Sequence, residues 1–534
     1  MGGRKSRAGL TGTLLTALLL TGLGCHKPVV RPQSDDEPEK DRYGIKTVGE
    51  LTSFGSVEPL NVAGVGLVVG LEGTGSPAPA GDYRQMLEKE LLRQKVPDVK
   101  KVLNSSDCSL VLVSALIPAG ARKGDRIDIE VSLPPGSKTT SLKGGYLKHC
   151  LLYNYDLLGN LNPEKFAGSN RAVLGHAIAH AEGPVTVGFG SGDEQAKLKT
   201  GRIWGGGRTR VDRPLHLILH SKVQSARVAN LIATRINSAF APTVQSPGAE
   251  VARFQSNAVV LLKVPHQYQH NLPRFLRVVR LVPVEESPVA EKNNTDTPRK
   301  PYRMQLQEDL RDPARTVTAA LRLEALGQSS IEPLKSGLQH DSPLVRFCAA
   351  EALAYLGSPA CGEELARVVR TQPYLRAYAL TAMASLDEAV CHVKLREVLT
   401  TSADDETRYG AFRALRALDE RDPDLAGELL NEAFWLHRIP SEAEPLVHVS
   451  VSKRPEIVLF GSSQKLRPPF AIRAGEFVLT ASAEDERCSV THIPLHGEGD
   501  SPTRSRCSLE LAEIIKCLAA HGAAYSDILE VIRQ

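Results

Sequence analysis

The sequence has no CxxC cysteine pair, little charge excess of either sign, and no long hydrophobic run beyond one near its N-terminus. Without CxxC spacing, the usual clustered zinc and iron–sulfur sites are excluded. The 65 Lys and Arg residues nearly match the 61 Asp and Glu residues, so charge does not indicate nucleic-acid binding. Because one core rarely exceeds about 250–300 residues, a chain of 534 residues predicts about three or four domains.

Motifs for nucleotide binding and for nucleophilic catalysis are also missing. The Gly-rich stretches Gly64–Gly66 and Gly73–Gly75 do not follow the G-x-G-x-x-G spacing, and no P-loop lysine is present. No serine lies in a nucleophile elbow, and no carboxylate pair stands apart from ordinary charged surfaces. We therefore predict that the protein is not an enzyme, with no catalytic residue and no cofactor.

Two histidine pairs have the HxxxH spacing that can place two metal ligands on one face of a helix. The residues around His176 and His180 favour a strand, in which positions i and i+4 lie about 13 Å apart. His266 and His270 lie in a polar segment typical of a solvated loop. We therefore predict no metal site, although Glu182 lies near the first pair.

Residues 1–24 have the pattern of a bacterial export signal. Three basic residues precede an apolar stretch from about Leu10 to Leu23, which is short for a bilayer span. Small residues directly precede Cys25, as in bacterial lipoprotein signals, so Cys25 is the candidate lipidation site. The alternative is an ordinary signal peptide with an incidental thiol. Residues 25–42, with three prolines and an acidic run from Asp35 to Asp41, predict a solvated tether.

Residues 43–284 predict a mixed α+β region. Short Val/Ile/Leu runs alternate with Gly/Pro/Asp turns, and in Arg126–Ser132 apolar and charged residues alternate strictly, as in a strand with one buried face. Helical spacing of apolar residues occurs in Tyr83–Gln94 and Ser225–Phe240. The other expected strands are Gly66–Val69, Leu110–Ile117, Val173–Ala179, Leu215–Leu219 and Ala258–Val264.

The same region resembles the flagellar P-ring protein family. The stretch Asn61–Gly75 reads NVAGVGLVVGLEGTG and is similar to the family's GYGLVVGLDGTGD signature, with Val65 in place of the aromatic residue. The resemblance continues in order and spacing through Leu110–Pro118, Gly124–Ser132 and Ser141–Leu147. The glycines of these stretches are expected to serve backbone geometry rather than a ligand. They are Gly64, Gly66, Gly70, Gly73, Gly75, Gly144 and Gly145.

A polar linker at 285–300 precedes an internal repeat, which we place at 301–440. The leucines that mark its copies are spaced 30, 30 and 32 residues apart, and an arginine stands ten residues before each of the last three. Each copy resembles a short HEAT-like helix pair, and such pairs stack into an all-α solenoid. The repeat arginines are interpreted as structural donors to carboxylates or carbonyls of the adjoining repeat, with partner binding as the alternative. The marker leucines are Leu326, Leu356, Leu386 and Leu418, and the arginines are Arg346, Arg376 and Arg408.

Residues 450–534 return to the strand pattern and end in two helices, with Ser508 and Ser526 as candidate N-caps. This ending resembles the terminal helix–turn–helix of the P-ring family. In an oxidising compartment, Cys507 has Cys488 and Cys517 as candidate disulfide partners.

The resemblance implies a fold and a function. The fold class is α+β, a P-ring-type mixed body with an inserted all-α HEAT-like solenoid. The function is that of an exported subunit that assembles with its own copies into a ring around the flagellar rod, in the periplasm, as a bushing. Implied partners are the rod, the L-ring proteins and, as a further candidate, peptidoglycan, with a lipid on Cys25 as a membrane anchor. The alternative is an envelope lipoprotein adaptor that binds other proteins through its repeats.

Overall fold

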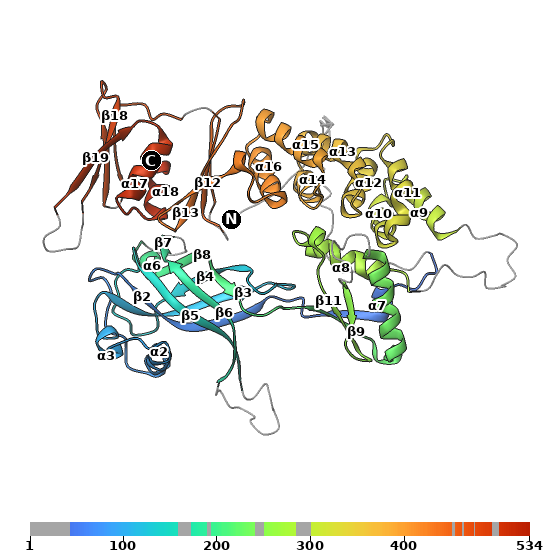
Figure 1. The fold of residues 1–534 in the computed structure, drawn as a ribbon, viewed down its shortest axis with the longest axis horizontal. Helices are drawn as coiled ribbons and strands as arrows, with labels where there is room; N and C mark the ends of the chain where they lie inside the picture. The colour runs from blue at the N-terminus through green and yellow to red at the C-terminus, as the bar shows by residue number, and fades with distance from the viewer. Residues whose placement is uncertain are drawn as a thin grey trace, which may run out of the picture. The chain divides into compact units, whose positions relative to one another are not determined.

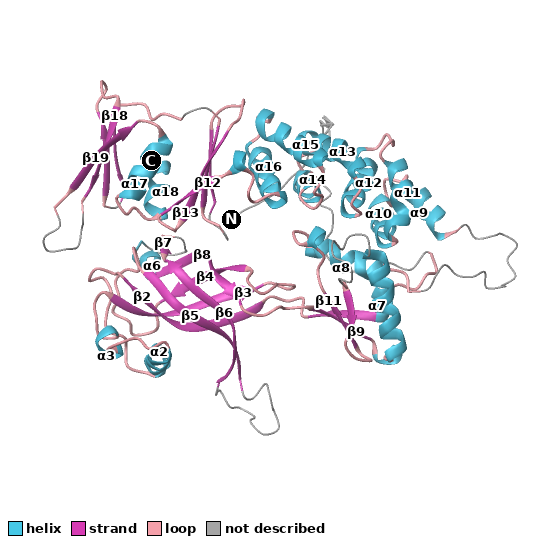
Figure 2. Ribbon diagram, viewed as in Figure 1, coloured by secondary structure: helices cyan, strands magenta, loops and turns pink. Residues whose placement is uncertain are grey.

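The computed structural model describes residues 43–157, 172–188, 194–240, 250–284, 301–450, 454–461, 464–474, 476–493 and 501–534. These residues form an α+β protein with an all-α block between β-rich segments, as the sequence predicts (Figures 1 and 2). No helix in the described part of the chain is long and apolar enough to cross a bilayer. Cys25 and the expected signal and tether lie outside the described residues.

The first part is a seven-stranded sheet that closes on itself, because its edge strand β4 also pairs with β8. Strict alternation in β4 points Ile127, Ile129 and Val131 into the enclosed core, while its charged residues face outward. The strand order is β4-β3-β2-β5-β6-β8-β7. The bounds are β2 Leu60–Val69, β3 Cys108–Ile117, β4 Arg126–Ser132, β5 Tyr146–Leu157, β6 Ala172–Pro184, β7 Thr186–Val187 and β8 Thr200–Thr209.

Two helices, α2 (Asp82–Arg93) and α3 (Val99–Val102), pack against the outside of this closed sheet. Leu87 and Leu91 of α2 are buried against Leu67 and Leu110 of β2 and β3. The sequence places α2 within a residue of its observed limits, because its apolar residues recur at helical spacing. A short helix, α6 (Glu194–Lys199), precedes β8.

The second part is a smaller α/β body in which one face of a four-stranded sheet is covered by helices. The sheet has the order β1-β9-β11-β10 and is antiparallel where its pairings are defined. The stripe of Ala229, Ile232 and Ile236 predicted from the sequence is the buried face of α7. The bounds are α1 Val48–Leu51, β1 Thr52–Gly55, β9 Leu215–Leu219, α7 Ala226–Phe240, β10 Ala252–Phe254, β11 Val259–Leu262 and α8 Leu272–Leu281.

The helical block follows as two layers of stacked helices. Even-numbered helices pack in sequence, α10 on α12, α12 on α14 and α14 on α16, and α13 packs on α15 in the second layer. Leu356, one of the marker leucines, caps the C-terminus of α12, and Leu326 does the same for α10. The bounds are α9 Tyr302–Leu310, α10 Thr316–Ala325, α11 Ile331–Gly337, α12 Pro343–Tyr355, α13 Gly362–Thr371, α14 Arg376–Met383, α15 Ala389–Thr401 and α16 Asp405–Leu418.

The helices end at Leu418, whereas the sequence placed the repeats as far as residue 440. Gly427–Leu430 and Phe434–Ile439 are the strands β12 and β13 of a hairpin. Its turn is made by Asn431 and Glu432, both with positive φ (51° and 53°), and the Ala433 N–H donates to the Leu430 carbonyl at 3.0 Å. Such a turn is usually marked by glycine, and this turn contains none, so the sequence pattern does not predict the hairpin.

The C-terminal layers consist of two four-stranded sheets with α17 and α18 packed between them. In the first sheet β13 runs parallel to β15, and the second sheet is antiparallel throughout its defined pairings. Tyr525 of α18 donates to the Ser450 carbonyl at 2.7 Å and thereby ties the last helix to the first sheet. The bounds are β14 Leu446–Ser450, β15 Glu456–Phe460, β16 Phe470–Ala474, β17 Phe477–Ala481, β18 Arg487–His492, β19 Thr503–Ser508, α17 Leu511–Ala520 and α18 Tyr525–Arg533.

Two predictions for this region, the N-cap residues and the pairing of cysteines, have different outcomes. The predicted N-caps are wrong, because Glu510 caps α17 and Ala524 caps α18, while Ser508 ends β19 and Ser526 lies inside α18. The thiols do come together: Cys488 and Cys507 face each other across β18 and β19. No disulfide is formed among the described cysteines, so the choice of disulfide partner for Cys507 stays a prediction.

A buried charge cluster joins the α/β body to the helical block. Arg274 of α8 is 3% exposed and ion-pairs with Glu324 of α10 at 2.5 Å and with Glu351 of α12 at 2.7 Å, both carboxylates being fully buried. The Tyr268 hydroxyl donates to Glu324 at 2.7 Å. The ring centroid of Tyr355 lies 4.7 Å from Cζ of Arg274. Burial raises the pKa of Glu324 despite the attraction of Arg274, because desolvation penalises the carboxylate.

A second junction joins the helical block to the C-terminal layers. Phe412 of α16 packs edge-on against Phe460 of β15, and one continuous apolar core runs from the α/β body through the helices to this strand. His437 of β13 is fully buried here. Its Nδ1 donates to the Leu425 carbonyl at 2.9 Å and its Nε2 accepts from Arg416 at 3.1 Å, an arrangement that only the neutral ring can make.

Replacing Arg274 by Met should lower the free energy of unfolding by about 4 kcal/mol, because two carboxylates would remain buried without their common cation. Urea denaturation of the full chain measures this. The triple variant Arg274→Met, Glu324→Leu and Glu351→Leu should recover most of the loss, since no buried charge then remains unpaired. A loss below about 1 kcal/mol in Arg274→Met would show that the cluster does not hold the junction.

His437 makes stability depend on pH. Burial lowers its pKa to about 4, and Arg416 acts in the same direction. As the pH falls, His437 of the unfolded chain binds a proton near pH 6.5, whereas His437 of the folded chain binds one near pH 4. Unfolding free energy should therefore fall by up to about 3 kcal/mol between pH 6.5 and pH 4. Urea denaturation across this range should show a smaller slope for His437→Asn, and an unchanged slope would contradict the assignment.

Candidate functional site

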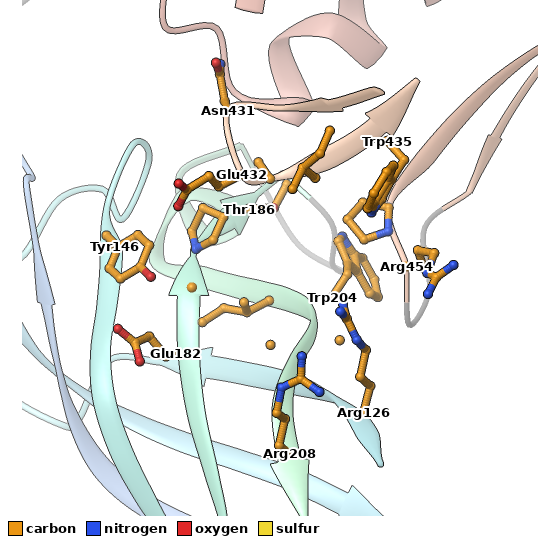
Figure 3. Close-up of a pocket in the computed structure, with 18 of the residues that line it drawn as sticks. Arg126, Tyr146, Glu182, Thr186, Trp204, Arg208, Asn431, Glu432, Trp435 and Arg454 are labelled. Carbon is orange, nitrogen blue, oxygen red and sulfur yellow. The ribbon is translucent and has the colours of Figure 1, made fainter. Parts of the chain in front are cut away.

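A cavity of about 560 Å³ lies between the outer surface of the closed sheet and the hairpin of the C-terminal layers (Figure 3). We call it the Arg–Trp pocket, after the residues that dominate one end. Strands β4 to β8 of the closed sheet supply one wall, and β12, β13, the turn between them and the two residues before β15 supply the other. The lining includes Arg126, Tyr146, Glu182, Trp204, Arg208, Asn431, Glu432, Trp435 and Arg454.

Alternation along β8 brings two of these side chains to the pocket. The odd-numbered residues of β8, such as Ile203, point into the closed sheet, so Trp204 and Arg208 point outward. Trp435 and Glu432 come from the other wall, on and just before β13. The hairpin turn at Asn431 and Glu432 therefore positions the second wall.

One end of the pocket is basic and aromatic. Figure 3 shows Arg126, Arg208 and Arg454 grouped near Trp204 and Trp435. Burial lowers the pKa of Arg126, and the like charges of Arg208 and Arg454 lower it further. Arg454 has Glu420 as an ion-pair partner, whereas no ion pair of Arg126 or Arg208 is formed among the described residues. This end therefore favours an anionic group with an apolar part that packs on indole rings.

The opposite end is acidic. Glu182 and Glu432 lie beside Tyr146 (Figure 3). Burial is the larger cause that raises the pKa of this tyrosine, and the two carboxylates raise it further. Tyr146 is 37% exposed. The two ends together give the pocket a polarity that a bound segment of mixed charge would have to match.

The described residues do not assemble a recognisable catalytic centre. The Ser505 hydroxyl lies 2.7 Å from His521 Nε2, but the other ring nitrogen faces the Thr503 hydroxyl at 3.4 Å and not a carboxylate. A serine–histidine pair without an acid to orient the ring lacks one member of the hydrolase triad. Among the described residues, no group of three or more potential ligands is arranged to hold a metal ion.

The structure places the first histidine pair on a strand, as the sequence indicates, whereas the second pair starts in a 3₁₀ helix and not in a loop. His176 and His180 lie on β6, where the second stacks on His149 of β5 with ring centroids 5.4 Å apart. His266 begins a short 3₁₀ turn that ends at Tyr268, and this tyrosine joins the buried charge cluster.

The P-ring-like glycines lie at close approaches and turns of the closed sheet. A Cβ on Gly64 of β2 would come well inside 3.0 Å of the Leu151 carbonyl oxygen on β5. Gly75 has the same relation to the Cys108 carbonyl. Gly66 and Gly145 are also crowded by side chains, whereas Gly70, Gly73 and Gly144 have positive φ in turns. None of the seven lines the Arg–Trp pocket.

The repeat arginines lie inside the helical block and bind protein groups. Arg346 ion-pairs with Glu364 at 3.0 Å, and Arg376 with Asp404 of the adjoining repeat at 2.8 Å. Arg408, 2% exposed, donates to the Glu444 carbonyl at 2.6 Å. Arg376 thus contacts the adjoining repeat, whereas Arg346 pairs within its own helix pair and Arg408 binds a carbonyl beyond the helices, so the structural role of the three residues stays a prediction.

Sequence reasoning did not find the pocket residues. The signal that could have indicated them is the scarcity of tryptophan: the chain has two, and both line this pocket. The alternation of β8 further predicts that Trp204 faces outward, where a large aromatic residue is unusual unless something packs on it.

Comparison with known proteins gives consistent results for the first half of the chain. Residues 47–292 match the model of the flagellar P-ring protein family. A flagellar P-ring protein of Oleidesulfovibrio alaskensis is 28% identical over 265 residues, covering 46% of this chain and 64% of that protein. One from Nitratidesulfovibrio vulgaris is 26% identical over half of this chain and 67% of its own length. One from Syntrophus aciditrophicus is 34% identical over 27% of this chain and 33% of its own length.

The fold defines an α+β protein with an inserted all-α block. Its closed sheet and α/β body, within residues 47–292, match the flagellar P-ring protein family. The resemblance seen in the sequence is thereby confirmed for this part. The chain spans about 64% of the Oleidesulfovibrio relative and a third of the Syntrophus relative. The resemblance of residues 454–534 to the end of that family lies beyond the match and stays a prediction.

Replacing Gly64 by Ala should lower the free energy of unfolding by about 3 kcal/mol, because the new Cβ must push β2 away from β5. Gly136→Ala is the control: this glycine has φ +81° in a loop with nothing within 4 Å, so only backbone strain of about 1 kcal/mol is expected. Urea denaturation compares the two variants. Equal losses would mean that the close approach at Gly64 does not constrain the closed sheet.

Proposed function

We propose that the protein is a structural subunit of the flagellar P ring, exported to the periplasm and assembled with its own copies around the rod as a bushing. The observation that carries this proposal is the family match over residues 47–292, which covers the closed sheet and the α/β body. Relatives named flagellar P-ring protein match the same region.

A ring subunit acts through its surfaces, without a chemical step. A closed ring of identical copies needs heterologous interfaces, in which one face of a subunit meets a different face of the next. Partners in this proposal are other copies of the chain, the rod and the L-ring proteins, with peptidoglycan as a further surface and a lipid on Cys25 as an anchor.

The helical block would move with the ring as a fixed part of each subunit. Its first helices share the Arg274 cluster with the α/β body, and its last helix shares an apolar core with the C-terminal layers. Such a block can enlarge each subunit or present a surface to another envelope protein.

A second candidate function, an envelope adaptor that binds proteins through the helical block, is favoured by one observation. The block exposes large apolar side chains, including Tyr374 at 58% and Val393 at 60%. Exposed apolar residues of this size are candidate contacts for a partner.

Removing the gene should abolish motility and leave basal bodies without P rings, as electron microscopy of purified basal bodies would show. Labelled wild-type protein supplied in trans should restore motility and label the ring. Full motility with normal rings in the strain that lacks the protein would contradict the ring function.

The variant Tyr374→Asp with Val393→Asp separates the two candidates. Both positions are exposed, so folding should be unaffected. A ring subunit should still restore motility with this variant, whereas an adaptor should lose its partner in co-purification from envelopes.

A further inference from the structure

We infer that the Arg–Trp pocket binds the acidic, proline-containing segment Asp35–Asp41 of a second copy of this chain. The inference rests on the proposed ring function in one respect only, the need for head-to-tail contact between copies. The pocket and the chemistry of its lining residues do not depend on the ring function.

The pocket is suited to an anionic segment with an apolar residue. Its basic end carries Arg126 and Arg208 without an ion-pair partner among the described residues, next to two indole rings. Arginine binds carboxylates through paired N–H groups, and indole faces pack well on flat apolar rings. A bound segment should therefore place carboxylates on the arginines and a ring between the tryptophans.

The chain contains such a segment in front of its first described residue. Residues 35–41 read DDEPEKD, so Pro38 is flanked on both sides by glutamate. Two further acidic residues precede it, and Lys40 follows it within two positions. A proline ring between carboxylates matches the indole and guanidinium groups of the basic end. The lysine matches the acidic end, where Glu182 and Glu432 lie.

The short length of chain between Tyr43 and this segment favours binding between two copies over binding within one copy. The first described residue, Tyr43, is held at the start of the helical block, where its ring packs on Tyr302 and its hydroxyl donates to Asp309 at 2.6 Å. Tyr43 and Pro38 lie five positions apart, so at full extension the proline reaches about 17 Å.

The pocket lies beyond the other end of the block. Helices α10, α12, α14 and α16 stack in turn, and three spacings of 8–10 Å give about 27 Å before the sheet that carries Trp435 begins. Because about 27 Å exceeds the reach of Pro38, the segment of one copy is matched with the pocket of another.

Intrinsic fluorescence tests the binding directly, because the two tryptophans of the chain both line the pocket. The full chain is titrated with a synthetic peptide of residues 33–42. We expect a saturable change in emission that weakens as salt is raised, and no change with a peptide in which every Asp and Glu is replaced by Asn or Gln. No response to the acidic peptide, or an equal response to the neutral one, would overturn the inference.

Arginine variants locate the contact. Arg126→Gln and Arg208→Gln should each weaken peptide binding by at least tenfold, while Arg227→Gln, an exposed arginine on α7 outside the pocket, should leave it unchanged. Circular dichroism confirms that each variant is folded. Undiminished binding in both pocket variants would refute the assignment.

Cross-linking tests whether the segment comes from another copy. Pro38 is replaced by benzoylphenylalanine in one of two differently tagged full-length copies expressed together in the native host. We expect cross-linked peptides that join the two tags and contain Trp204 or Trp435. Cross-links within one copy alone would overturn the arrangement between copies. A chain that builds P rings but shows neither binding nor cross-links would keep its proposed function and lose this inference.

Discussion

The buried cluster around Arg274 is the interaction on which the arrangement of this chain depends. One guanidinium from α8 of the α/β body forms ion pairs with a carboxylate from α10 and with another from α12. Taking three charged groups out of water is costly, and only their close mutual contacts offset that cost. Neither the body nor the helical block can keep its half of the cluster alone, so each requires the other to be folded and in place.

This dependence changes how the helical block is understood. From the sequence it is an insertion between two stretches that resemble one family, and such insertions are often separable. Here the same apolar core includes Ile232 of the α/β body, Phe347 of the helices and Phe460 of the C-terminal layers. Deleting the block would expose that core at both ends. Surface substitutions are therefore the cleaner way to study what the block does.

Much of the fold could be predicted because it depends on local periodicity. Alternation in Arg126–Ser132 gave a strand with its observed limits, and helical spacing gave α7 within one residue. The predictions were wrong where tertiary contacts or unusual turns determine the local structure. The hairpin at Asn431 has no glycine, and Ser526 lies inside a helix whose first turn is closed instead by Asp527, which accepts from the Ala524 N–H at 3.1 Å. The pocket was beyond sequence reasoning, because Trp204 and Trp435 are 231 positions apart and nothing local joins them.

The continuous core also has a consequence for the covalent chain. Val284 and Pro301 bound a polar stretch between the α/β body and the first helix of the block. The two sides of that stretch are held together by Arg274, by its two glutamates and by the apolar residues around them. A protease that cuts the backbone between these positions would thus release no fragment. The nicked molecule would elute as one species and come apart only in denaturant.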